Sequence, residues 1–354
     1  MTKPELFGLF VSEIAEAIQP LGIQKYRAAQ IAHWLYKQGV SAFQEMTNLP
    51  AAQRDVLAAS FAVPAVSCVA RQDSADGRTT KYLLSLSDNQ AVETVLMRQP
   101  YGNSVCVSTQ IGCAMGCLFC ASALGGVVRN LESSEILAQV LYIQHELAKE
   151  GQTVTSVVIM GSGEPFLNYD NVLRFVRLCH DPAILGLGYR SFTVSTSGIV
   201  PGINRLAAEG LPLTLAISLH APTDELRTTL MPINKTYKIA DILAAADHYA
   251  ALSGRRITYE YTLIRDVNDQ LHHARLLVSL LRGKLAAVNL IPVNPVPDHN
   301  LHRPASAAIE AFAAALKKGG LAVTVRREMG TDIQAACGQL RKRARENRGR
   351  ESFD

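Results

Sequence analysis

Three cysteines in the first half of the chain, Cys113, Cys117 and Cys120, follow the spacing C-x₃-C-x₂-C. Three thiolates on one short loop can bind three irons of a cubane iron–sulfur cluster, and the fourth iron then has no protein ligand. A catalytic metal site keeps an open position of this kind for a small molecule. The alternatives are structural thiols or half a zinc site, but zinc sites use paired spacings and four ligands. The spacing therefore favours an open iron–sulfur cluster.

From Ser104 onward, strand-like and helix-like segments alternate along the chain. Short apolar runs predict strands, and segments with apolar residues at i, i+3 and i+4 predict helices between them. The expected strands cover residues 104–109, 155–160, 191–195, 213–219, 257–263 and 287–291, with one more at 321–326. Six β–α repeats imply parallel strands with right-handed crossovers. Because no G-x-G-x-x-G follows a strand, we expect an α/β fold with a partial (βα)6 TIM-type barrel rather than a Rossmann sheet.

Glu164, Ser195, His220 and Asn294 each lie at or just beyond the end of an expected strand, which is the usual active-site face of such a barrel. Gly163 lets the backbone approach a ligand closely, and the Glu164 carboxylate could bind an ammonium group. Asn294, between two prolines, could hydrogen-bond a nucleobase edge. Each residue alone could be an ordinary polar loop position, and His220 could be a lone metal ligand. Their recurrence after successive strands favours a shared site.

Three further positions in the chain need separate interpretations. Glu93 lies in an expected strand at Ala91–Met97, where it is either on the solvent face or a catalytic carboxylate. Cys337 has small neighbours, so it is either a core cysteine or a thiol open to a cavity. Cys68 and Cys179 have no partner motif and are expected to be ordinary buried thiols.

The composition fits a large α/β domain and a small one, with 354 residues of which 48% are hydrophobic. We expect a helical region with a linker at 1–90, the barrel at 91–320, and an extension with a basic tail at 321–354. The net charge of +4 does not by itself indicate nucleic-acid binding. Residues 1–20 do not read as a signal peptide, and no apolar run is long enough to cross a membrane. Seven cysteines, clustered in metal-type spacing, suit a reducing cytosol.

Several motifs together resemble the RlmN/Cfr family of radical S-adenosylmethionine (SAM) RNA adenosine methyltransferases. They are Cys106 seven residues before Cys113, and the segments Met160–Pro165, Ser218–His220, Ile291–Pro295 and Ala335–Leu340. The resemblance runs from about Gly22 to Leu340, and Gly-Glu-Pro165 matches RlmN better than the Gly-Glu-Ala of Cfr. Two positions depart from the pattern: Ser162 replaces a common methionine, and Val293 replaces a frequent aromatic residue.

The resemblance implies a [4Fe-4S] cluster on Cys113, Cys117 and Cys120, and two SAM molecules per turnover. It implies SAM contacts from Gly163, Glu164, Ser195, Ser218, Leu219, His220 and Asn294. In the family, one SAM methylates the cysteine matching Cys337, and the second gives a radical that activates this methyl group. The carbon then adds to carbon 2 of an adenine. The residue matching Glu93 removes the ring proton, and the one matching Cys106 releases the product by forming a disulfide.

The implied substrates are large-subunit (23S) ribosomal RNA at the peptidyl transferase centre and a tRNA anticodon loop, both with a splayed base. The N-terminal helical domain is expected to help hold the RNA. A cytoplasmic monomer reduced by flavodoxin or ferredoxin, with no membrane contact, is implied as well. Three alternatives stay open: a Cfr-like enzyme acting on carbon 8, a different radical SAM enzyme, and a non-catalytic iron–sulfur RNA-binding protein that does not consume SAM.

Overall fold

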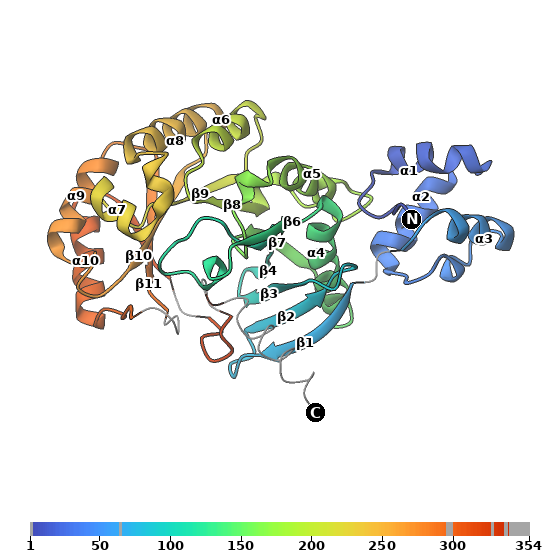
Figure 1. The fold of residues 1–354 in the computed structure, drawn as a ribbon, viewed down its shortest axis with the longest axis horizontal. Coiled ribbons are helices and arrows are strands. Elements are labelled where there is room, and N and C mark those ends of the chain that lie inside the picture. The colour runs from blue at the N-terminus through green and yellow to red at the C-terminus, as the bar shows by residue number, and fades with distance from the viewer. Residues whose placement is uncertain (1–2, 64–65, 295–299, 327–328, 336–338, 340–354) are drawn as a thin grey trace.

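The computed structural model describes residues 3–63, 66–294, 300–326, 329–335 and 339. A curved sheet of ten strands runs through most of this part of the chain (Figure 1). In sheet order the strands are β1 Ser67–Asp73, β2 Thr79–Ser85, β3 Ala91–Gln99, β4 Gly102–Cys106, β7 Val154–Ile159, β8 Phe192–Thr196, β9 Thr214–Ser218, β10 Ile257–Leu263, β11 Ala286–Pro292 and β12 Ala322–Val325. The strands from β4 to β12 pair in parallel, which confirms the expected barrel-type fold.

Helices connect the parallel strands and cover the outer face of the sheet (Figure 1). They are α4 Ser133–Ala148, α5 Tyr169–His180, α6 Val200–Ala208, α7 Asp224–Leu230, α8 Ile239–Ser253, α9 Leu271–Leu281 and α10 Ser306–Lys318. Their apolar faces pack on the sheet, as the T-shaped contact of Phe175 on α5 with Phe192 on β8 illustrates. None of the helices in the described part of the chain has the length and apolar character that crossing a bilayer requires.

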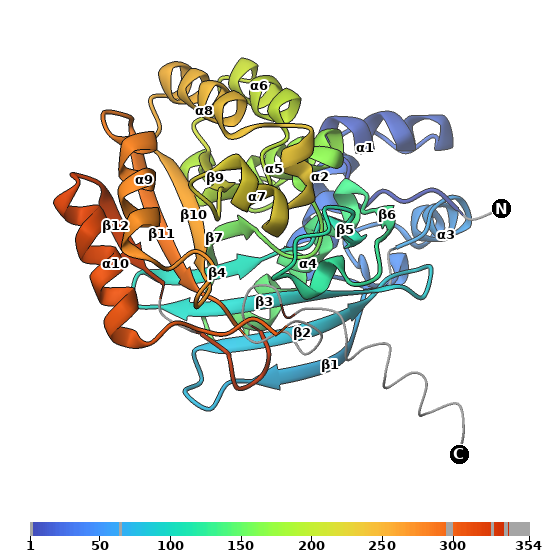
Figure 2. The same cartoon turned by 60° about the vertical axis from the view of Figure 1, so that its left-hand side comes forward.

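Three antiparallel strands extend the sheet beyond β4 (Figure 2). The expected hairpin is present: β2 pairs with β3 around a turn in which Asn89 has a φ of 62°. Sequence reasoning missed β1 and also the small hairpin of β5 Gln110–Gly112 and β6 Val127–Asn130. Because β3 pairs with β4, this extension places Glu93 beside the first strand of the barrel.

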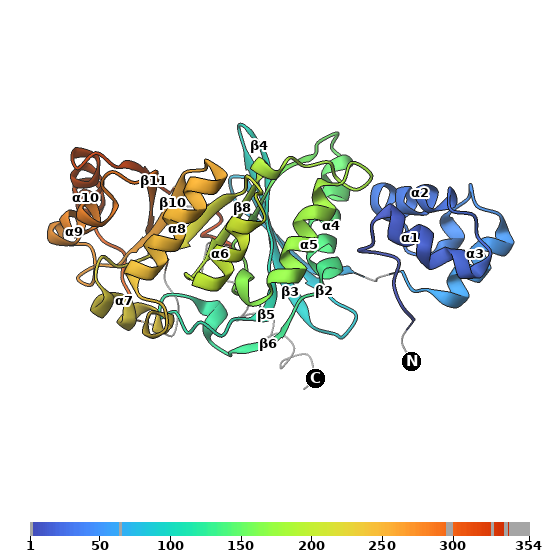
Figure 3. The same ribbon diagram turned by 90° about the horizontal axis from the view of Figure 1, so that it is seen from above.

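The N-terminal helices α1 Val11–Ile18, α2 Arg27–Ala32 and α3 Ala51–Ser60 form a separate group beside α4 and α5 (Figure 3). Arg174 on α5 donates to the carboxylate of Glu13 on α1. Gly39 approaches the ring of His145 on α4 so closely that an added Cβ would lie 2.4 Å from it. The fully buried hydroxyl of Tyr36 donates to the carbonyl of Leu9 and accepts from the Gly8 and Leu9 amides.

Replacing Tyr36 with phenylalanine should destabilise this helical group by about 1–3 kcal/mol, because it leaves buried backbone groups without their partner. Denaturant unfolding followed by the fluorescence of the single tryptophan, Trp34, measures the change. Tyr26→Phe is the matched control, since Tyr26 is exposed. Equal stability of the two variants would contradict this role of the Tyr36 hydroxyl.

Candidate active site

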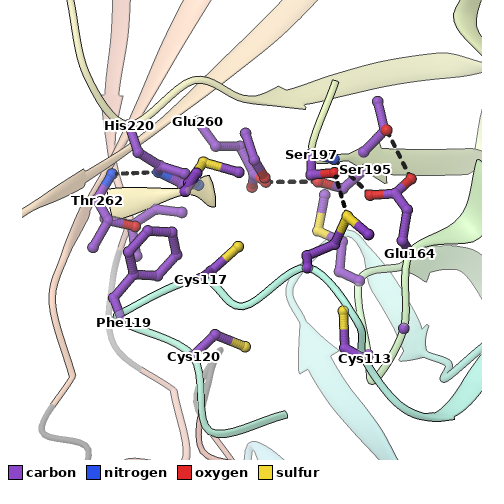
Figure 4. A pocket seen from close by; sticks show the side chains of 18 of the residues that line it. Cys113, Cys117, Phe119, Cys120, Glu164, Ser195, Ser197, His220, Glu260 and Thr262 are labelled. Carbon is purple, nitrogen blue, oxygen red and sulfur yellow. Dashed lines mark hydrogen bonds between the residues drawn. The ribbon is translucent and has the colours of Figure 1, made fainter. Parts of the chain in front are cut away.

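A pocket opens at the C-terminal ends of strands β7 to β11, next to the loop that carries the three spaced cysteines (Figure 4). The empty space inside it, including the part that is open to solvent, is about 900 Å³. Nine residues singled out from the sequence line it together: Cys113, Cys117, Cys120, Gly163, Glu164, Ser195, Ser218, His220 and Asn294. Leu219 is fully buried between two of these lining residues.

The cysteine loop is fixed by backbone hydrogen bonds at both ends. The Cys113 amide donates to the Gly126 carbonyl at the β5–β6 hairpin, and the Leu118 amide donates to the Leu230 carbonyl at the end of α7. Gly116 takes a φ of 67°, which lets the loop turn between the cysteines. Figure 4 shows the three sulfur atoms facing a common space across from Glu164 and His220.

The chemistry of these thiols fits a cluster. The pKa of Cys113 is raised to about 11, mainly by burial, and the pKa of Cys117 is raised for the same reason. The neighbouring sulfur atoms raise the pKa of both thiols further. Thiolates in this loop therefore need a positively charged group among them. No group of three or more His, Cys, Asp or Glu side chains within the described ranges is placed to hold a metal ion. A cubane spreads its thiolates over separate irons, so three spaced cysteines suit it better than they suit zinc.

Glu164 presents a buried, preorganised carboxylate to the pocket. Its oxygens accept from the Thr196 hydroxyl at 2.7 Å, the Ser197 amide at 2.7 Å and the Phe166 amide at 3.1 Å. Burial outweighs these donors and raises the pKa of Glu164. A buried carboxylate that lines a pocket suits a cationic ligand, because the cation offsets the cost of burying the charge.

His220 enters the pocket from a strained backbone position with a φ of 57°. Its Nδ1 accepts a hydrogen bond from the Thr262 amide at 2.9 Å. Since an amide N–H can only donate, the proton of the neutral ring lies on Nε2. Burial, followed by the charge of Arg227, lowers the pKa of His220 to about 3. His220 is therefore a neutral donor to whatever occupies the pocket.

Sequence reasoning missed Glu260, which also lines the pocket. Its carboxylate accepts from the Ser195 hydroxyl at 2.8 Å, and its carbonyl accepts from the amides of Leu219 and His220. The sequence held a signal for it, because Glu260 is the one charged residue in the expected strand Ile257–Leu263. Fully buried Arg227 was missed as well, and nothing in its surrounding sequence distinguishes it from a surface arginine.

Two other predicted site residues lie on the neighbouring antiparallel strands. Cys106 on β4 is buried in a small apolar cluster with Val95, Met160 and Ala335, and Met160 itself lines the pocket. Glu93 on β3 forms an ion pair of 3.3 Å with Lys81 on β2. Cys337 lies outside the described residues. No disulfide bond joins two cysteines of the described segments.

The two departures from the family pattern lie at different places. Val293 is buried, lines the pocket and packs against the segment of Cys117 to Phe119. Ser162 is buried beside the pocket, where its amide donates to the Ser108 hydroxyl and its carbonyl accepts from the amides of Thr109 and Gln110. The valine therefore changes the pocket wall, whereas the serine belongs to the backbone connection between β4 and β7.

The neutral His220 predicts a specific dependence on pH. Its folded-state pKa lies below the unfolded value of about 6.5, so it contributes stability above pH 6.5 that is lost as the pH falls toward 3. Nitrogen-15 NMR of the folded protein should show the Nε2–H tautomer unchanged between pH 8 and pH 5. Titration of this ring within that range would contradict the assigned tautomer and burial.

Comparison with known proteins agrees with this geometry. The Radical SAM superfamily matches residues 107–277, and the ribosomal RNA large subunit methyltransferase N-terminal domain matches residues 4–63. A protein of Symbiobacterium thermophilum named probable dual-specificity RNA methyltransferase RlmN is 53% identical, over 98% of this chain and 94% of the relative. A protein of the same name from Geobacillus kaustophilus is 50% identical, over 98% of this chain and 95% of the relative. The crystal structure of a radical SAM methyltransferase from Sphaerobacter thermophilus is 44% identical, covers 96% of this chain and 99% of its own, and superposes with a TM-score of 0.93. The chain belongs to the RlmN/Cfr family of radical SAM RNA methyltransferases.

Proposed function

We propose that this enzyme methylates carbon 2 of adenosine in 23S ribosomal RNA at the peptidyl transferase centre and in a tRNA anticodon loop. The relatives named as dual-specificity enzymes support two kinds of RNA substrate. Carbon 2 of adenine is not nucleophilic, so a polar transfer from SAM does not reach it. This explains why the reaction uses a pocket built for a cluster and a radical source.

Cys113, Cys117 and Cys120 would hold a [4Fe-4S] cluster, and the pocket would hold SAM beside it. When bound, the cluster and SAM supply a 5′-deoxyadenosyl radical. Glu164 binds the SAM ammonium group, while Ser195, Ser218 and Asn294 offer polar atoms to the rest of the molecule. The Nε2–H of His220 donates a hydrogen bond to SAM. Gly163 packs so closely against Thr109 that an added Cβ would lie 2.7 Å from its hydroxyl oxygen, so only a glycine allows this turn of the pocket wall.

The observation that carries the proposal is the apolar cluster around Cys106. Ala335 packs in it, and the candidate methyl carrier Cys337 follows only two residues later in the chain. We propose that Cys337 takes a methyl group from a first SAM and that hydrogen abstraction leaves a methylene radical on its sulfur. This radical adds to carbon 2 of the adenine, and the ring radical so formed loses one electron, which the oxidised cluster would accept, together with the proton on carbon 2. The Cys106 thiolate then attacks the Cys337 sulfur. A disulfide forms as the sulfur–carbon bond breaks, and the released carbon takes a proton.

Glu93 is proposed to accept the proton that leaves carbon 2. It lies two residues before Val95 on β3, so its side chain is on the same face of the sheet as Val95 and the Cys106 cluster. The buried ammonium of Lys81 pairs with Glu93 and also donates to the Gln334 carbonyl at 3.3 Å. Lys81 thus connects the proposed base to the segment that leads to Cys337.

The remaining proposals concern the setting of the reaction. We divide the chain into a helical RNA-binding region with its linker at 1–90, a radical SAM barrel at 91–320 and a C-terminal extension at 321–354. Lys25 and Lys37 are exposed on the helical region and can contact phosphates. The enzyme would act as a cytoplasmic monomer and take electrons from a flavodoxin or ferredoxin.

The two proposed catalytic cysteines should fail in different ways. Cys337→Ala should leave RNA unmodified, because the methyl carrier is missing. Cys106→Ala should still form the bond to adenine and then stall as a covalent protein–RNA adduct, since nothing attacks the Cys337 sulfur. Denaturing gels with and without nuclease detect the adduct, and mass spectrometry of digested ribosomal RNA and tRNA identifies 2-methyladenosine.

Cys68→Ala is the matched control, because Cys68 lies on β1, away from the pocket, and its thiol donates to the nearby Ala70 carbonyl. This variant should modify RNA normally. A Cys106→Ala enzyme that methylates Cys337 but forms no adduct would refute the role of Cys106. Finding 8-methyladenosine in place of 2-methyladenosine would refute the proposed position on the ring.

Glu164→Gln should weaken SAM binding about ten- to a hundredfold, because it removes a buried carboxylate that pairs with an ammonium group. The affinity of the unchanged enzyme should fall as the pH drops toward the raised pKa of Glu164, since protonation cancels the charge. Equilibrium dialysis with the cluster intact measures both effects, with Glu225→Gln as an exposed control. Unchanged SAM affinity in the Glu164→Gln variant would argue against the ammonium contact.

A further inference from the structure

Arg227 on α7 is a fully buried arginine that holds together the strand ends behind the pocket. Its Nη2 donates to the Ser197 carbonyl after β8 at 2.6 Å and to the Ser218 carbonyl of β9 at 3.0 Å. Its Nε donates to the Leu219 carbonyl at 3.1 Å, and its Nη1 donates to Oδ1 of Asn234 at 3.0 Å. The planar guanidinium thus fixes two neighbouring strand ends that carry pocket residues.

All four acceptors of this guanidinium are neutral. In the described segments, no carboxylate oxygen lies close enough to the guanidinium of Arg227, within 4.0 Å, to form an ion pair with it. The charge of Asp224, on the same helix, acts on Arg227 without an ion pair between them. A buried cation without a counterion in contact is costly, because its hydration is lost and hydrogen bonds to neutral groups replace only part of it. An anionic group beside the arginine would offset this cost.

The cysteine loop is such a neighbour. Leu226 and Leu230 on α7 pack in one apolar cluster with Cys117, Leu118 and Phe119, and the Leu118 amide bonds to the Leu230 carbonyl. Burial dominates the pKa values of both Arg227 and Cys117, and the electrostatic effects agree with this contact. The charge of Arg227 lowers the pKa of Cys117, and the Cys117 thiolate, followed by the Asp224 carboxylate, raises the pKa of Arg227. Three thiolates with a [4Fe-4S]²⁺ core carry a net negative charge, and one-electron reduction adds another.

We propose that Arg227 is a positioning residue with two effects on the proposed cluster site. Its guanidinium fork sets the ends of β8 and β9 for SAM, and its positive charge stabilises the reduced cluster. The inference rests on the proposed binding of the cluster by Cys113, Cys117 and Cys120. One buried side chain thus fixes the geometry of the pocket and also raises the electron affinity of the cluster.

Substitutions separate the charge from the fork. Arg227→Gln should lower the electron affinity of the cluster about tenfold, which is about 59 mV for a one-electron couple, because the positive charge is lost. Arg227→Lys should keep the potential close to that of the unchanged enzyme but weaken SAM binding about tenfold, because a lysine cannot reach both strand ends. Redox titration followed by electron paramagnetic resonance gives the potential, and equilibrium dialysis gives the SAM affinity.

Asn234→Asp provides a milder test if Arg227→Gln does not fold. It places a carboxylate on the Nη1 partner, so the charge of Arg227 is neutralised while the fork stays in place. This variant should also lower the potential. Arg255→Gln is the control, because Arg255 bonds to Thr214 at the opposite end of β9 and should affect neither measurement.

Each outcome decides one part of the proposal. An unchanged potential in Asn234→Asp, with the cluster signal intact, would overturn the role of the charge. Unchanged SAM affinity in Arg227→Lys would overturn the role of the fork. Absence of a [4Fe-4S] signal from the reconstituted, unsubstituted enzyme would instead refute the proposed cysteine ligands, and the inference about Arg227 with them.

Discussion

The parallel pairing of the barrel strands is the constraint on which the site depends, because it brings the carboxyl ends of distant segments to one edge. The pairing continues beyond the strands themselves. The carbonyl of Glu260 accepts from the amides of Leu219 and His220, and the carbonyl of Ser162 accepts from those of Thr109 and Gln110. These bonds leave little freedom to the turns that carry the site. The pocket is therefore shaped before any ligand enters, which lowers the entropic cost of binding.

Burial gives this edge its chemical character. Glu164, His220 and Arg227 are all buried, yet each has its hydrogen bonds supplied by backbone groups or neutral side chains. The consequences differ in sign: burial raises the pKa of the carboxyl group and lowers those of the imidazole and the guanidinium. A ligand with an ammonium group, beside an anionic cluster, would compensate the charges that the protein alone leaves costly.

Most of the strands were predictable because their signals are local. Ile257–Leu263 alternates aliphatic or aromatic residues with polar ones, which is the period of a strand, and its predicted limits agree with β10. The hairpin of β5 and β6 was not predictable, because each strand is short and the three cysteines in the segment between them follow the spacing of a cluster site rather than the pattern of a hairpin turn. The cysteines and Glu164 could be found from spacing and position. Arg227 could not be found in this way, since its role depends on carbonyls from two strands that come together only in the folded chain.

The antiparallel extension is also where the described part of the C-terminal segment meets the rest of the chain. Strands β1 to β3 continue the sheet past β4, and the described part of the C-terminal segment lies along them. The Asp332 carboxylate accepts from the Ala75 amide at 2.8 Å, and the Gln334 carbonyl accepts from Lys81. An added Cβ on Gly330 would lie 2.8 Å from Thr79, so only a glycine allows this approach. Without the extension, β4 and its Cys106 would lie at a bare sheet edge. With it, residues more than two hundred positions apart in the sequence, such as Lys81 and Gln334, share one partly buried contact.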